Sequence, residues 1–188
     1  MQSSRPAYLL ALPLTCVTLI MGAGPASAAA CANETLVPNA GNTALIGAAT
    51  RCLLNQERAR FGRKPLADSA ALTVPAQRFA QLMVNQRFFG HVGPTGDSVL
   101  VRVKRQSNYF SRRTLRYSVA ENIAWGSGEL GSPLEVVDFW MHSAGHRRNI
   151  LDRTYRDIGI GVAAGAPEDV GGAPAGTYTT VFGNQPTR

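Results

Sequence analysis

Hydrophobic residues recur every three or four positions along two early segments of the chain. In the first segment this spacing links Leu45, Ala49, Cys52 and Leu53. It predicts an amphipathic helix that has Thr43 as a candidate N-cap and stops at Gly62. The same period predicts a second helix over residues 69–88, in which Pro75 marks either a kink or the true first turn.

A third strong helix signal lies in the second half of the chain. Ser132 is followed by Pro133 and, three positions after the serine, by Glu135. This order is a capping box with a proline at the first helical position, where its fixed φ suits a helix start. Gly145 is predicted to end or to bend the helix that begins here.

Three segments carry the pattern of β-strands. Residues 119–125 read as a strand, residues 157–164 alternate around glycines (IGIGVA), and residues 177–182 (TYTTVF) are rich in β-forming residues. Glycines inside a strand indicate that another backbone approaches closely. We expect the last two strands to form an antiparallel hairpin with a long Gly/Pro tip. Helices before and between strands predict a layered α+β fold.

The first thirty residues have the layout of a secretory signal. A short positive region with Arg5 precedes an apolar run over residues 8–21, and small residues follow. Cleavage after an A-x-A motif is predicted at Ala28 or Ala30, which makes the protein secreted. The apolar run is short for a membrane span, although an uncleaved N-terminal anchor is the alternative. No transmembrane segment is expected after the signal is removed.

The remaining chain is predicted to be one domain. With 188 residues, 45% of them hydrophobic and 16% charged, the chain is too apolar to be a disordered tail. It has no collagen repeat, no sustained heptads and no second long apolar run. We assign residues 1–30 to the signal, 31–42 to an N-terminal arm, 43–185 to the domain and 186–188 to a tail, and we expect a monomer.

The chain is basic, with 19 Lys and Arg residues against 12 Asp and Glu residues and a formal charge of +7. Such a surface attracts anionic polymers, including those of a cell envelope. The basic residues are scattered along the sequence and no nucleic-acid motif accompanies them, so we predict no specific nucleic-acid partner. A generic solvated basic surface is the simpler explanation of the charge.

Two cysteines, Cys31 and Cys52, remain once Cys16 leaves with the signal. In an exported chain they most simply form one disulfide, with two free or buried thiols as the alternative. A loop of about twenty residues makes such a bond worth about 3 kcal/mol in the loop-entropy model.

Candidate chemistry gathers in three segments: RFFGHVGPTG, VAENIAWG and WMHSAGHRRNIL. The first and third contain the only histidines, His91, His142 and His146. The second places Glu121 in a strand that otherwise reads as core. Burying a carboxylate is costly unless a partner compensates it, and an imidazole or a metal ion would serve.

Five segments in series, FFGHVGPTG, AENIAWG, DFWMHSAGHRRNIL, IGIGVA and YTTVFGN, resemble the successive signatures of the CAP superfamily. That superfamily unites cysteine-rich secretory proteins, antigen 5 and plant pathogenesis-related proteins, and its bacterial members are often called SCP-like. The resemblance runs from about Asn42 to Gln185. It implies a three-layer α-β-α sandwich with a central antiparallel sheet and a cleft that holds two histidines and two acidic residues.

The motif positions assign the cleft residues. His91 and His146 take the places of the two histidines and Glu121 that of the first acid. Ser143 stands where the second acid falls in animal and plant members, as in many bacterial members, which lowers the negative charge of the cleft. The rest of the family's disulfide pattern is absent from this sequence.

Three interpretations of the cleft remain open. His91, His146 and Glu121 could be ligands of a divalent cation, Zn²⁺ most plausibly. Ser143 beside His146 and Glu121 could serve a hydrolase, protease-like in character. The same groups could instead hold loops onto the sheet by hydrogen bonds. His142 and His146 have ligand spacing on a helix, yet no general base follows His142, which we read as an exposed helix-end residue.

The resemblance implies a secreted protein that acts by binding more readily than by turnover. Superfamily members bind sterols, fatty acids or other lipids, and some bind divalent cations. The predicted partners are therefore a lipid or sterol, or an anionic cell-envelope polymer. An enzyme of the hydrolase class and a structural or adhesive domain are the alternatives.

Overall fold

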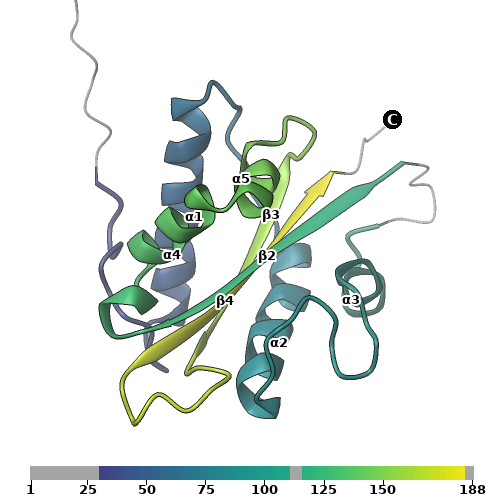
Figure 1. Cartoon of the computed structure of the whole chain (residues 1–188). Coiled ribbons are helices and arrows are strands. Elements are labelled where there is room, and N and C mark those ends of the chain that lie inside the picture. The colour runs from purple at the N-terminus through teal and green to yellow at the C-terminus, as the bar shows by residue number, and fades with distance from the viewer. Residues whose placement is uncertain (1–29, 111–115, 185–188) are drawn as a thin grey trace, which may run out of the picture.

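The computed structural model describes residues 30–110 and 116–184. Residues 1–29 of the predicted signal and the C-terminal tail lie outside the described residues. Helices form two layers around a sheet, as Figure 1 shows. One face of the sheet carries α1 (Thr43–Arg60), α4 (Pro133–His142) and α5 (Ala144–Leu151), and the other carries α2 (Ala70–Gln86) and α3 (Val99–Gln106).

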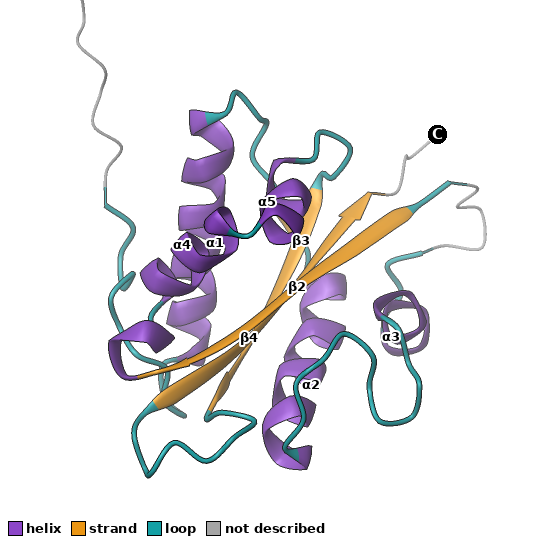
Figure 2. Ribbon diagram, in the orientation of Figure 1, coloured by secondary structure: helices purple, strands orange, loops and turns teal. Residues whose placement is uncertain are grey.

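The sheet has four strands in the order β1-β3-β4-β2 (Figure 2). They are β1 (Ala67–Asp68), β2 (Ser118–Ser127), β3 (Asp157–Ala164) and β4 (Ala175–Asn184), with a short 3₁₀ helix, η1 (Gly128–Gly131), after β2. The three long strands pair antiparallel, which confirms the predicted hairpin of β3 with β4 and the α+β sandwich. β1 was not predicted. It pairs parallel with β3 over two residues, too few to carry a hydrophobic period.

The helix ends differ from the sequence prediction in detail. Asn42, rather than Thr43, is the N-cap of α1. Gly62 does follow the helix end, with φ 62°, and its N–H donates to the carbonyl of Ala59. In α2 the Ser69 side chain caps the first turn, so Pro75 lies inside the helix and does not mark its start.

The break between α4 and α5 falls one position before Ala144 and not at Gly145. Ser132 caps α4 by accepting a hydrogen bond from the Glu135 N–H, as the capping box predicted. Ser143 is extended (φ −96°, ψ 119°) and ends α4, whereas Gly145 lies within α5. The prediction that Gly145 ends or bends the helix was wrong, because the neighbouring serine takes the non-helical conformation.

The glycines of β3 let α2 pack onto the sheet backbone to backbone. A Cβ atom on Gly159 would lie 2.1 Å from the carbonyl carbon of Leu72, and one on Gly161 would lie 2.2 Å from the backbone nitrogen of Gln77. This confirms the close approach that the IGIGVA pattern predicted. The Gln77 side-chain amide also donates to the Val162 carbonyl and accepts from its N–H, at 2.8 and 2.9 Å.

The main core lies between the sheet and the layer of α1, α4 and α5. Trp140 is fully buried there, and its indole N–H donates to the carbonyl of Ile123 on β2 at 3.1 Å. The Cys31–Cys52 disulfide is present and ties the N-terminal arm to α1, as predicted. Within residues 30–110 and 116–184, no helix has the length and apolarity needed to cross a bilayer.

Candidate functional site

Glu121, on the middle of β2, is the buried carboxylate that the sequence singled out. Only 2% of its side chain is exposed, and Arg102 on α3 donates to its Oε2 at 2.5 Å. The guanidinium is 4% exposed and lies 3.4 Å from the centre of the Phe79 ring. It also donates to the carbonyls of Asp97 (2.6 Å) and His91 (3.1 Å). Arg102 therefore supplies the charge that burial of Glu121 requires.

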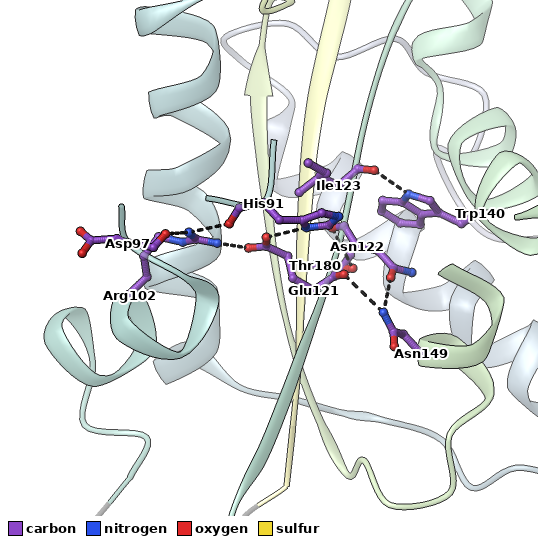
Figure 3. Close-up of polar contacts among 9 residues, drawn as sticks. All are labelled: His91, Asp97, Arg102, Glu121, Asn122, Ile123, Trp140, Asn149 and Thr180. Carbon is purple, nitrogen blue, oxygen red and sulfur yellow. Dashed lines mark hydrogen bonds and ion pairs between the residues drawn. The ribbon is translucent and has the colours of Figure 1, made fainter. Parts of the chain in front are cut away.

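His91 is held against the same carboxylate. Its Nδ1 lies 3.0 Å from Glu121 Oε1, and Figure 3 shows Arg102, Glu121 and His91 in one line of polar contacts. Because a carboxylate paired with a guanidinium accepts hydrogen bonds, Nδ1 is the nitrogen that donates. More than half of the His91 side chain, 55%, is exposed. The ring therefore presents Nε2 as its remaining polar atom.

His146 reaches the site from α5 through a pair of asparagines. Asn122, next to Glu121 on β2, donates to the carbonyl of His146 at 3.1 Å. Asn149, one turn further along α5, donates to Asn122 Oδ1 at 2.9 Å and to the carbonyl of Glu121 at 3.4 Å. These contacts fix α5 against β2 beside the carboxylate.

The imidazole of His146 has an unusual environment. Its ring centre lies 5.8 Å from that of Phe139 and 6.4 Å from that of Trp140. Among the described residues its buried Nδ1 has no hydrogen-bond partner. Burial, and then the positive charge of nearby His91, lowers the pKa of His146. This ring is therefore kept neutral at pH values where a free histidine is partly charged.

His91 and His146 line one cavity of about 350 Å³. Its other large lining side chains are apolar: Phe89, Ile123, Trp125 and Phe139. A second hollow of about 510 Å³ shares Ala124, Trp125 and Phe139 with the first and continues to Leu130 and Val136. We call the two together the imidazole groove, because the histidines lie along it and its walls are largely apolar.

The other candidates take different places. Ser143 lines neither part of the imidazole groove, and its hydroxyl makes no hydrogen bond to His146 among the described residues. His142 lines the larger hollow but belongs to α4, where its Nδ1 lies 2.9 Å from the carbonyl of Asp138, and its side chain is 77% exposed. It is thus an exposed helix-end residue, as the sequence indicated.

The contacts of Glu121 decide which side chains are available as ligands for the predicted divalent cation. Both oxygens of Glu121 are engaged, by His91 and by Arg102, so the carboxylate orients an imidazole instead of facing the cavity. Within the described residues no group of three or more His, Cys, Asp and Glu side chains is arranged to hold a metal ion. The two imidazoles alone remain as protein ligands, so a Zn²⁺ site built from His91, His146 and Glu121 stays a prediction.

The decisive residue that sequence reasoning missed is Arg102. It lies in a short basic stretch, VRVKR, whose other charged members face solvent, and nothing in that stretch distinguishes it. Its burial arises only because α3 packs beside β2. A pairing of Glu121 with an imidazole could be anticipated from the cost of a buried carboxylate; the pairing with this guanidinium could not.

Comparison with solved structures shows which folds the chain is similar to. It aligns with an extracellular SCP-domain protein of Bacillus anthracis (TM-score 0.57, 23% identity, 77% of this chain and 41% of that one). It also aligns with an outer surface protein of Borrelia burgdorferi (TM-score 0.58, 16% identity, 72% of this chain and 90% of that one). At these identities the likeness concerns the fold.

Sequence comparison gives the family. The chain is 38% identical over 109 residues to the protein YkwD of Bacillus subtilis (strain 168). That match spans 58% of this chain and 39% of YkwD, so the chain corresponds to well under two thirds of that relative. The model of the cysteine-rich secretory protein family, CAP, matches residues 53–181, which include His91, Glu121 and His146. The chain therefore belongs to the CAP family of cysteine-rich secretory proteins.

Proposed function

We propose that this protein is an exported CAP domain that binds an amphiphilic lipid, such as a fatty acid, in the imidazole groove. One observation carries the proposal: the two hollows of the imidazole groove share Phe139 in their lining. Their walls are largely apolar, and His91 and His146 line the smaller of the two. Small-molecule sites typically combine apolar walls with a few placed polar groups in volumes of about 300–1,000 Å³. An anionic or hydroxyl head group would meet His91 and His146, while the chain would lie along Phe139 and Leu130.

Export is supported by three independent features. The similar proteins of Bacillus anthracis and Borrelia burgdorferi are described as extracellular and as an outer surface protein. The Cys31–Cys52 disulfide suits an oxidising compartment. The first thirty residues have the layout of a secretory signal.

The state of the polar groups favours binding over turnover. Glu121 is committed to Arg102 and His91, which removes it as a free general base. Ser143 lies outside the groove, whereas a hydrolytic nucleophile needs its base within hydrogen-bonding reach. A divalent cation, in this proposal, is held by His91 and His146, and Glu121 orients the first ring from behind, as carboxylates commonly do for metal-bound histidines.

The test is displacement of a fluorescent fatty acid from the purified protein. Phe139 is 57% exposed and shared by both hollows, so Phe139→Ser should weaken binding by about tenfold, because an exposed ring that contacts ligand loses its apolar contact. Leu45→Ser is the matched control, since Leu45 is 51% exposed on α1, away from the groove, and should leave affinity unchanged.

A second variant separates the chemical roles. His91→Gln with His146→Gln should weaken binding of a fatty acid more than of its methyl ester, since only the acid carries a charged head group. The same pair should abolish any Zn²⁺ binding measured by titration calorimetry. If the Phe139→Ser variant binds the lipid saturably and with the affinity of the wild type, the groove is not the binding site. Ester or peptide hydrolysis by the wild type, lost in the histidine pair, would favour the hydrolase alternative.

A further inference from the structure

A separate hollow of about 350 Å³ lies where α1 ends and where the chain passes from α5 to β3; Figure 1 shows these two segments at the same end of the molecule. Five of its six lining residues are cationic. They are Arg58, Arg63, Lys64, Arg153 and Arg156, and the sixth is Gly62. We call this group the basic hollow. Its members come from two segments, residues 58–64 and 153–156, that are far apart in the sequence and meet only in the fold.

Arg58 forms the floor of the basic hollow and joins its two halves. It is 1% exposed. Its Nε donates to the carbonyl of Lys64 at 2.8 Å, and its Nη1 donates to those of Ile150 (2.6 Å) and Asp152 (3.0 Å). Within the described residues this guanidinium donates only to carbonyl oxygens, so no hydrogen-bonded carboxylate offsets its positive charge. It therefore adds to the potential of the hollow without neutralising it.

Among the described residues, no carboxylate forms an ion pair with the cations of the basic hollow. None of the ion pairs formed by residues 30–110 and 116–184 includes any of the five. Arg63 donates its Nε to the carbonyl of Leu151 at 2.9 Å, and Arg156 donates to the carbonyls of Arg153 and Tyr155. Burial, then the charges of Arg156 and Arg63, lower the pKa of Arg58, against a smaller opposing effect of Asp152. The like charges are thus close enough to repel one another.

We propose that the basic hollow binds consecutive phosphate groups of a flexible phosphodiester polymer of the poly(glycerol phosphate) type. Guanidinium groups pair with phosphate oxygens, often in a bidentate manner, and three of the four cations around buried Arg58 are arginines: Arg63, Arg153 and Arg156. Five positive charges exceed what one phosphate neutralises, so a repeating anion fits better than a single ion. No lining residue is aromatic, so the bases of a single-stranded nucleic acid would find no ring to stack on.

This site is independent of the proposed lipid groove, since the two share no lining residue. The basic hollow gathers five of the chain's positive charges at one place, whereas the sequence indicated only a generic basic surface. Lys64 and Arg153 are exposed rim residues whose side chains make no hydrogen bond within the described part of the chain. Their backbone carbonyls hold Arg58 and Arg156, and side-chain substitution leaves those carbonyls in place.

The experiment titrates the purified protein with poly(glycerol phosphate) by calorimetry at an ionic strength of about 0.15 M, where exposed charges more than about 8 Å apart are largely screened from one another. Lys64→Gln with Arg153→Gln should weaken binding by about tenfold or more, because two cations next to the anion are lost. Arg78→Gln with Arg116→Gln is the matched control. It removes the same charge from exposed residues, one on α2 and one just before β2, and should change affinity by less than about twofold. Equal thermal stability of both variants shows that folding is intact.

Three results would overturn the proposal. Equal weakening in both variants would mean that net charge alone drives binding. Inorganic phosphate that binds as tightly as the polymer would exclude the polymer as the preferred ligand. Tighter binding of an oligothymidylate with the same number of phosphates would assign the hollow to nucleic acid instead. Phe139→Ser should leave polymer binding unchanged, which keeps this test separate from that of the lipid groove.

Discussion

The packing of α2 on the glycine face of β3 yields the sharpest prediction. In Gly161→Ala the new Cβ would lie 2.2 Å from the backbone nitrogen of Gln77, whereas ordinary contact begins at 3.4 Å. The helix must therefore retreat by about 1.2 Å. That retreat separates Phe79 and Met83 from their buried positions and pulls Gln77 from the edge of β3.

The expected cost is about 3 kcal/mol, the upper part of the range for overpacking, because the obstacle is backbone and cannot rotate away. Urea unfolding followed by tryptophan fluorescence should show a midpoint lower by roughly 1.5 M, for a slope of about 2 kcal/mol per molar.

Gly47→Ala provides the control. A Cβ at that position in α1 would lie 3.9 Å from the Ile160 side chain, an ordinary contact. Alanine also favours a helix over glycine by up to about 1 kcal/mol, so the midpoint should hold or rise. A midpoint for Gly161→Ala equal to that of the wild type would refute the reasoning, since it would mean that α2 does not lie against this strand.

Three further predictions concern charge and crosslinking. Arg102→Met should destabilise the fold by about 3–5 kcal/mol in urea unfolding, because Glu121 stays buried without the guanidinium that compensates its charge and keeps only its contact with His91, and a loss under about 1 kcal/mol would contradict the assigned pairing. The pKa of His146 is lowered, so the unfolded chain binds more protons than the folded one below pH 6.5, and stability should fall as pH drops from 6.5 toward the lowered value. His146→Gln should flatten that slope in thermal melts and exposed His142→Gln should not; a slope unchanged in both would exclude His146 as its source. Reducing the Cys31–Cys52 bond, with its separation of 21 residues, should cost about 3 kcal/mol, seen as a lower Tm with reductant, and an unchanged Tm would contradict this.

The contacts of the Arg102–Glu121 pair also hold the parts of the imidazole groove in place. The guanidinium binds the carboxylate, two loop carbonyls and an aromatic face at once, so the loop that carries His91 is fixed from α3. The asparagine pair fixes α5, with His146, from β2. Both imidazoles are thus positioned by neighbouring groups, which favours a preformed groove over one that closes on its ligand.

Features that depend on neighbours in sequence were determined by the sequence itself. Local sequence patterns predicted the capping box at Ser132, the glycine stop at Gly62 and the glycine face of β3. The disulfide was predicted because only two cysteines remain in a chain that carries a secretory signal. The buried carboxylate at Glu121 was also evident, since a charged residue inside an apolar strand stands out.

Only the tertiary structure decided the contacts between distant groups that leave no mark in the sequence. The two-residue strand β1 has no period to detect, and the extended conformation of Ser143 moved a helix break away from the glycine that should have made it. Arg102 looked like any surface cation until α3 packed it against Glu121, and the cations of the basic hollow come from two segments, residues 58–64 and 153–156, that lie far apart along the chain. Burial and mutual distance set the energy of a charge, and neither is a property of local sequence.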